Sequence, residues 1–245
     1  MQIESAAIVC ALRTHAEHGA VVRLLTPREG LQAAYVRCAR GRRMRPVLVP
    51  GNLVQARLRS RTEEQLAFAE IELTHSRAPL LSEALAAAAI EWVTSLVATM
   101  LPEGHPYPRL YEALDGLLSA IEAAPSALGW ASSLVRFELL LLAELGFGLD
   151  LERCAVSNGN DDLVAVSPRS GRAVSASAAE PYADRLLALP AFLKSGGQGS
   201  WQEVAQGLAL TGHFIERDLL TGRAAALETA RSRLVDRLRR AGGMI

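Results

Sequence analysis

The sequence predicts an α+β protein of several domains, with a small closed β-barrel at the N-terminus and an α-helical domain after it. In the first eighty residues, apolar and polar side chains alternate in short runs, as they do in half-buried strands. Beyond Pro79, apolar residues recur every three or four positions, which is the period of an amphipathic helix. Arginines are concentrated in the first part, so the two parts also differ in charge.

Five short segments have the composition of β-strands. Alternation is clearest where Val54, Ala56 and Leu58 are interspersed with polar residues. The turn at residues 26–30 has a proline near its start and a glycine at its end, which favours a hairpin. Because closing short strands into a barrel removes exposed edges, we predict a five-stranded OB-fold β-barrel in residues 1–79. The expected strands are Ala6–Arg13, Ala20–Thr26, Leu31–Cys38, Asn52–Ser60 and Gln65–Thr74.

Three apolar stripes predict three helices at the start of the helical domain, residues 80–245. The first covers 81–100, the second ends at Pro125, and the third, Ser126–Leu145, is apolar nearly all round. A helix of that kind is expected to be central and buried.

Periodicity fades over residues 150–179, where Ser, Gly, Asn and Asp accumulate. We expect a loop-rich subdomain there, with a hairpin between 163–166 and 172–174. Helices are predicted again from Ser200, which opens a capping box with Glu203, and over Ala224–Arg240.

A net charge of zero conceals an uneven distribution. Residues 1–80 hold twelve arginines and seven glutamates, whereas the rest of the chain holds fourteen basic and nineteen acidic residues. Guanidinium groups pair with phosphate oxygens in a fork geometry, so the cluster predicts a surface for a polyanion such as DNA. A solvated loop is the alternative for its densest part, the arginine loop (Arg37–Pro46). The candidate DNA-binding residues are Arg13, Arg23, Arg37, Arg40, Arg42, Arg43, Arg45, Arg57 and Arg59.

Two further features could extend this surface, and each has a structural alternative. Tyr35 could stack on a base, although an inward-facing barrel tyrosine is favoured. The arginines of the last helix could continue the cationic surface, although positive charge also stabilises a helix C-terminus. These arginines are Arg231, Arg233, Arg237, Arg239 and Arg240.

The sequence shows no pattern typical of an enzyme, a cofactor site or a metal site. Lys194 precedes its glycines, the reverse of a phosphate-binding loop. His15 and His18 lie between two predicted strands without a third ligand nearby, and Asp161–Asp162 is expected to be solvated. Three widely spaced cysteines suit reduced thiols, and no signal peptide or membrane span is recognisable, so we expect a cytoplasmic, nucleoid-associated protein.

Several stretches, in this order and at this spacing, resemble the RecO family of recombination mediators over nearly the whole chain. They are Ile8–Arg13, Leu24–Gly30, Arg40–Arg43, Leu101–Gly104, Leu110–Tyr111, Arg136–Leu139 and Leu145–Phe147. The resemblance implies binding of single- and double-stranded DNA, annealing of complementary strands, and a partnership with RecR. It also implies that the protein helps to load the recombinase RecA onto strands coated with single-stranded DNA-binding protein.

One departure from the family concerns zinc. Many members of the family look as if they carry four zinc-binding cysteines, in two pairs, after the central helix. In this chain Cys154 stands at the first position, but Ser157 takes the place of its partner, and residues 174–177 contain no cysteine for the second pair. Structural zinc needs four ligands, so we expect a metal-free, degenerate zinc-finger-like insertion with a buried Cys154.

The resemblance also implies that the C-terminal tail of single-stranded DNA-binding protein binds the helical domain. Arg136 is the candidate for its carboxylate; the alternative is an ion pair of Arg136 with Glu138 or Glu144. For the whole chain, the alternative function is an OB-containing protein–protein adaptor whose arginine loop binds an acidic partner instead of DNA.

Overall fold

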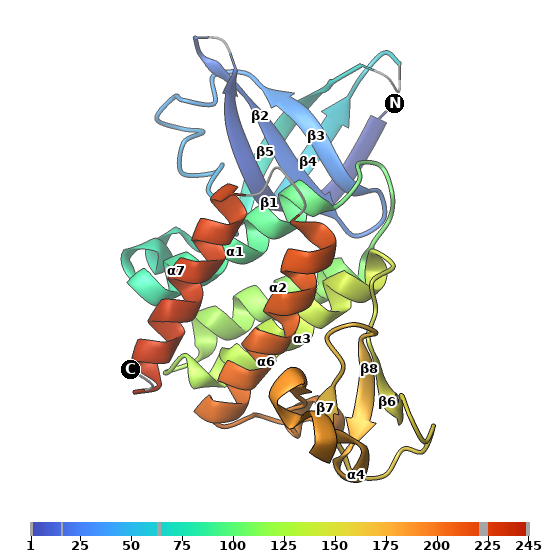
Figure 1. The fold of residues 1–245 in the computed structure, drawn as a ribbon. Coiled ribbons are helices and arrows are strands. Elements are labelled where there is room, and N and C mark those ends of the chain that lie inside the picture. Colours follow the sequence, from blue (N-terminus) through green and yellow to red (C-terminus); the bar gives the residue numbers. More distant parts are fainter. Residues whose placement is uncertain (1, 16, 63–64, 221–224, 244–245) are drawn as a thin grey trace. The chain divides into compact units, whose positions relative to one another are not determined.

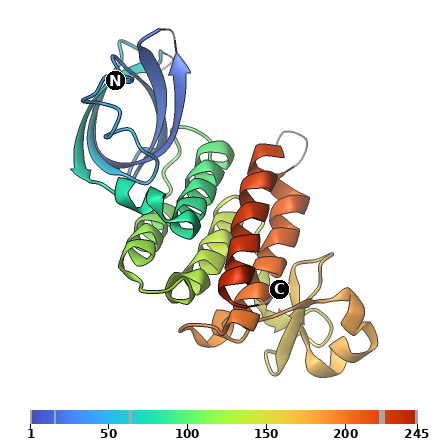
Figure 2. The ribbon, with the colours of Figure 1, turned by 90° about the vertical axis from the view of Figure 1, so that its left-hand side faces the viewer.

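Five strands near the N-terminus close into a barrel in the order β1-β2-β3-β5-β4, with β4 pairing back onto β1 (Figure 1). The structure is a computed structural model that describes residues 2–15, 17–62, 65–220 and 225–243. All pairings are antiparallel except β3 with β5. The predicted OB-type barrel is thus confirmed, and Figure 2 shows its closed wall. The strands are β1 (Gln2–His15), β2 (Gly19–Thr26), β3 (Gly30–Val36), β4 (Leu53–Arg59) and β5 (Ala67–His75).

Alternation along the strands fills the barrel. Val22 and Leu24 of β2, and Val54, Ala56 and Leu58 of β4, are at most 1% exposed and belong to one core. β1 is longer than predicted because its N-terminal half pairs with β4 and its C-terminal half with β2. A register shift between Val9 and Ala11 lets it bend between the two partners.

The predicted hairpin between β2 and β3 is held by its own side chains. The hydroxyl of Thr26 accepts from the Glu29 amide at 3.1 Å and donates to the Gly30 carbonyl at 3.0 Å. Gly30 has a φ of +68°, and an added Cβ would lie 1.7 Å from the His105 carbonyl oxygen. Both the backbone angle and the space therefore require glycine.

The arginine loop after β3 is folded into turns rather than extended. β3 ends at Val36, two residues earlier than expected, and Cys38 has a φ of +53° outside the strand. Backbone bonds from Met44 and Arg45 to the Gly41 carbonyl close the turn. Ala39 and Leu48 are each 2% exposed and anchor the connection to the barrel core, which leaves the arginines between them outside.

The first of two compact units, Met1–Glu122, also includes helices. These are η1 (Ala78–Ser82), α1 (Ala84–Met100) and α2 (Pro108–Ala123). Arg77, only 3% exposed, joins the barrel to α2: it donates to the Gly51 carbonyl at 2.9 Å and pairs with Asp115 at 2.9 Å.

The second unit, Ala123–Ile245, combines helices with a small sheet. The sheet has four strands in the order β6-β8-β7-β9, and three of them, β6, β7 and β8, lie in residues 150–179, which were expected to be mainly loops. The predicted β7–β8 hairpin is confirmed. None of the described helices is long and apolar enough to span a bilayer. The elements are α3 (Leu128–Glu144), β6 (Asp150–Cys154), β7 (Leu163–Val166), β8 (Arg172–Ser175), α4 (Ala176–Ala179), η2 (Glu180–Arg185), β9 (Leu187–Ala188), α5 (Phe192–Ser195), α6 (Trp201–Phe214), η3 (Ile215–Leu219) and α7 (Ala225–Ala241).

Local signals placed two of these helices correctly. α6 starts with the predicted capping box: the Ser200 hydroxyl accepts from the Glu203 amide at 3.3 Å, and the Glu203 carboxylate accepts from the Ser200 amide at 2.8 Å. α7 is described from Ala225; the expected first residue, Ala224, lies outside the described residues. α3 packs against α6 and is buried along most of its length, as its apolar sequence predicted.

Candidate nucleic-acid interface

One row of directly paired residues crosses the outer wall of the barrel. Arg13 of β1 pairs with Val21, Val21 with Tyr35, Tyr35 with Phe68, and Phe68 with Arg59 of β4. Directly paired residues point to the same face of a sheet, and neighbouring strands lie about 4.8 Å apart. This outer row therefore has one candidate arginine at each end, with two aromatic rings between them.

The aromatic centre of the outer row is packed edge to face. Ring centroids are 5.8 Å apart for His15 and Tyr35 and 5.7 Å apart for Tyr35 and Phe68. Tyr35 lies over Gly19, where a Cβ would approach its ring to 2.4 Å. The favoured inward position of Tyr35 was wrong, because its neighbours Ala34 and Val36 take the inward places.

Arginines approach Phe68 from two sides. The Arg37 guanidinium carbon lies 4.9 Å from the centre of the Phe68 ring, and Arg43 lines the same hollow. Arg59 and Arg61 line a second hollow that also borders Phe68. Sequence reasoning missed both Phe68 and Arg61. Strand alternation alone could have placed Phe68 outside, because Ala67 is in the core.

Seven of the nine predicted arginines are exposed, and none of the seven forms an ion pair with a carboxylate among the described residues. Arg40 donates to the Glu17 carbonyl at 3.5 Å. Arg43 and Arg57 border a third hollow on the outer wall. The seven are Arg13, Arg37, Arg40, Arg42, Arg43, Arg45 and Arg59.

The other two candidates are charge-compensated. Arg57 forms an ion pair of 3.1 Å with its cross-strand neighbour Glu4, and Glu70 faces it from β5. Arg23 is paired with Glu103 at 2.8 Å and also donates to the Ala98 carbonyl. The uncompensated positive charge therefore lies on Arg13 of β1, at the Arg59 end of β4 and on the arginine loop.

Arg136 in the second unit contacts a neighbouring loop. Its guanidinium donates to the carbonyls of Phe192, at 3.1 Å, and of Gly197, and lies 5.2 Å from the centre of the Phe192 ring. The alternative in which Arg136 pairs with Glu138 is wrong: the Glu138 carboxylate contacts Arg231 of α7 at 3.2 Å.

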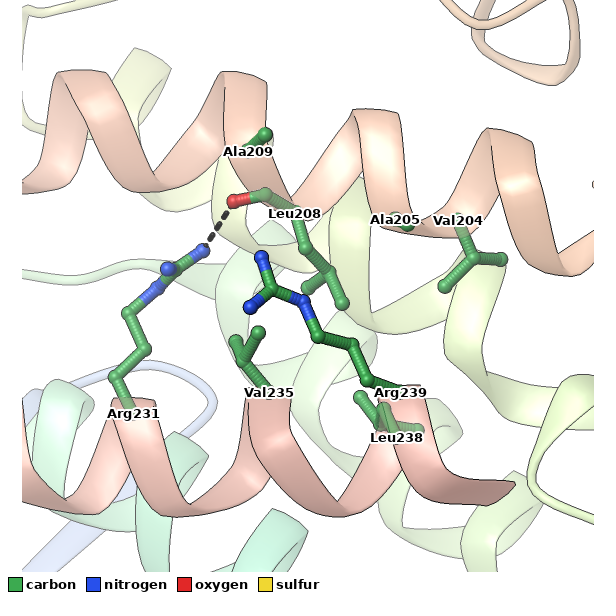
Figure 3. A pocket seen from close by; sticks show the side chains of 8 residues that line it. All are labelled: Val204, Ala205, Leu208, Ala209, Arg231, Val235, Leu238 and Arg239. Atoms are coloured by element: carbon green, nitrogen blue, oxygen red, sulfur yellow. Dashed lines mark hydrogen bonds between the residues drawn. The ribbon is translucent and has the colours of Figure 1, made fainter. Parts of the chain in front are cut away.

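The α7 arginines differ in exposure, and Figure 3 draws two of them, Arg231 and Arg239. Arg231 is 8% exposed and donates to the Leu208 carbonyl at 2.7 Å, so it does not extend a cationic surface. Arg239 is exposed and extends toward α6 across a slot of about 70 Å³. Leu208, Val235 and Leu238 are among the apolar residues that line this slot.

Cys154, the one thiol at the zinc site considered from the sequence, lies among hydroxyl groups. Cys154 is fully buried, as predicted, and its sulfur lies 3.4 Å from the Ser175 hydroxyl. Hydrogen bonds from Ser157 and then Ser175 lower the pKa of Cys154 to about 6. In the described part of the chain, no three His, Cys, Asp or Glu residues gather to hold a metal.

Comparison with known proteins agrees with this architecture. The family described as Recombination protein O N terminal matches residues 1–77, and Recombination protein O C terminal matches residues 81–225. A DNA repair protein RecO from Rhodospirillum centenum is 48% identical over 96% of this chain and 94% of its own length. RecO proteins from Phenylobacterium zucineum and a Caulobacter species are 46% and 43% identical, each covering 99% of both chains. The chain therefore belongs to the RecO family.

Proposed function

We propose that the chain mediates DNA repair and recombination as a strand-pairing scaffold, binding single- and double-stranded DNA on the outer wall of the barrel. The observation that carries the proposal is the group of seven exposed arginines on the outer row and the arginine loop. Guanidinium groups there would neutralise backbone phosphates and release condensed counterions. Neutralised strands repel each other less, so complementary strands can anneal without any bond being made or broken.

The proposed partners rest on family membership. RecR would join the complex, and the tail of single-stranded DNA-binding protein would bind the second unit near Arg136. The Arg136 guanidinium already donates to two backbone carbonyls, so a tail carboxylate would have to use its remaining N–H groups or replace these bonds. Loading of RecA would follow from displacing the coating protein.

A salt titration tests the phosphate interface. In the variant with Arg40, Arg42, Arg43 and Arg45 all replaced by alanine, the slope of log K against log salt should flatten by up to about 3 for single-stranded DNA, because each phosphate contact contributes about 0.7. Fluorescence anisotropy with a labelled oligonucleotide measures the slope.

The control removes the same charge from the second unit. Arg153, Arg169, Arg185 and Lys194 are all exposed, and their replacement by alanine should leave the slope near that of the wild type. Equal slopes for the arginine-loop variant and the wild type would overturn the proposal. A wild-type chain that passes through a DNA column but retains an acidic protein would instead favour the adaptor function.

A further inference from the structure

Phosphate binding does not account for Phe68. This side chain is 51% exposed near the start of β5, on the same outer face as Glu70 and Glu72. Single exposed apolar residues are common and need no explanation. Phe68 is different because it is part of an ordered aromatic group and lies between arginines on both sides.

The surroundings hold the Phe68 ring in place while leaving it accessible. Tyr35 supports it edge to face, with its ring plane at 87° to that of Phe68, and is itself wedged between His15 and Gly19. The two hollows that border Phe68 have volumes of about 490 and 530 Å³. Arg59 and Arg61 line one and Arg37 and Arg43 line the other, so an extended phosphate chain crossing the ring would meet arginines before and after it.

We infer that Phe68 is a stacking platform for an unpaired base of single-stranded DNA, with Tyr35 as its support. This rests on the proposed function, to which it adds the form of DNA that the barrel prefers. Every base has a π-face, so the platform tolerates any sequence, whereas the bases of a duplex are already stacked on each other. Arginines supply the salt-dependent affinity for both forms, and Phe68 supplies a salt-independent preference for single strands.

The test replaces Phe68 in the full-length chain. Phe68→Ala should weaken binding of an oligo-dT strand about 5-fold to 100-fold, while duplex binding stays within about twofold and the salt slope is unchanged. Phe68→Trp should keep oligo-dT affinity, and its fluorescence should be quenched by oligo-dT but not by a duplex. Phe147→Ala is the matched control, because Phe147 is 42% exposed in the second unit.

The outcomes separate this inference from the proposed function. If wild type binds both DNA forms and Phe68→Ala weakens neither, or weakens both equally, the platform is refuted while the phosphate interface stands. If wild type binds neither form at low salt, the proposed function itself fails. An oligonucleotide of abasic sites should bind wild type as weakly as oligo-dT binds Phe68→Ala; equal wild-type affinity for the two strands would also refute stacking.

Discussion

The buried ion pair between Glu138 and Arg231 makes a sharp prediction for the stability of the second unit. Glu138 is 0% exposed on α3, and its carboxylate accepts from Arg231 of α7 at 3.2 Å and from the Thr211 hydroxyl of α6. α6 can approach the Arg231 guanidinium because Gly212 has no side chain: a Cβ there would lie 2.5 Å from an Arg231 nitrogen. Together with Thr211, the pair thus joins α3 to the C-terminal helices α6 and α7.

Replacing one partner takes away an opposite charge in direct contact with the buried group that remains. Arg231→Met should therefore lower the free energy of unfolding by about 3–5 kcal/mol, and Glu138→Leu by a similar amount. The double variant, which removes both charges and keeps much of the volume, should recover most of the loss and lie within about 1 kcal/mol of wild type. Urea unfolding followed by far-UV circular dichroism gives these values.

The double-mutant cycle can contradict the coupling of Glu138 with Arg231. If the losses of the two single variants simply add in the double variant, the two groups are not coupled, and the helices are held by apolar packing alone. Arg240→Met is the control at an exposed position of the same helix, and it should change stability by less than about 0.5 kcal/mol.

Three further predictions concern thiols and one glycine. Hydrogen bonds lower the pKa of Cys154 from 9.0 to about 6, so folding favours its thiolate. The stability difference between wild type and Cys154→Ala should therefore be largest above pH 9 and should fall as the pH drops through about 6. Thermal unfolding at several pH values measures this difference. A thiol reagent such as DTNB should react with one thiol in the native protein, the exposed Cys38, and with three after denaturation. Cys10 and Cys154 are buried, and burial raises the pKa of Cys10 to about 12. Fast labelling of all three thiols in the native protein would contradict the buried positions. Gly30→Ala should lower the melting temperature by about 10 °C or more, since both its φ and the His105 carbonyl exclude a Cβ, and an unchanged melting temperature would show that this turn can rearrange.

Features that depend on a few neighbouring residues were predictable from the sequence. Alternation around Val54 identified β4, the Thr26–Gly30 segment identified its hairpin, and Ser200 with Glu203 marked the start of α6. Each depends on backbone geometry within one turn or strand. The cationic cluster was predictable for the same reason, because five of the nine candidate arginines lie in the ten consecutive residues of the arginine loop.

Compensation of charge was not predictable in this way. Arg57 and Glu4, or Arg23 and Glu103, lie far apart in the sequence and meet only through strand pairing or helix packing. Hence the structure pairs the candidates Arg23 and Arg57 with glutamates. It also places Arg61, which was not a candidate, beside Phe68.

The sequence by itself determined that a cationic β-barrel precedes a helical region, because hydrophobic period and residue charge are properties of local stretches. Tertiary structure alone decided which side chains share a surface. The parallel pairing of β3 with β5 brings Tyr35 beside Phe68, and the packing of α7 on α6 and α3 buries Arg231 against Glu138. Such contacts depend on which distant segments pair and in what register, and that is settled only when the whole core is buried at once.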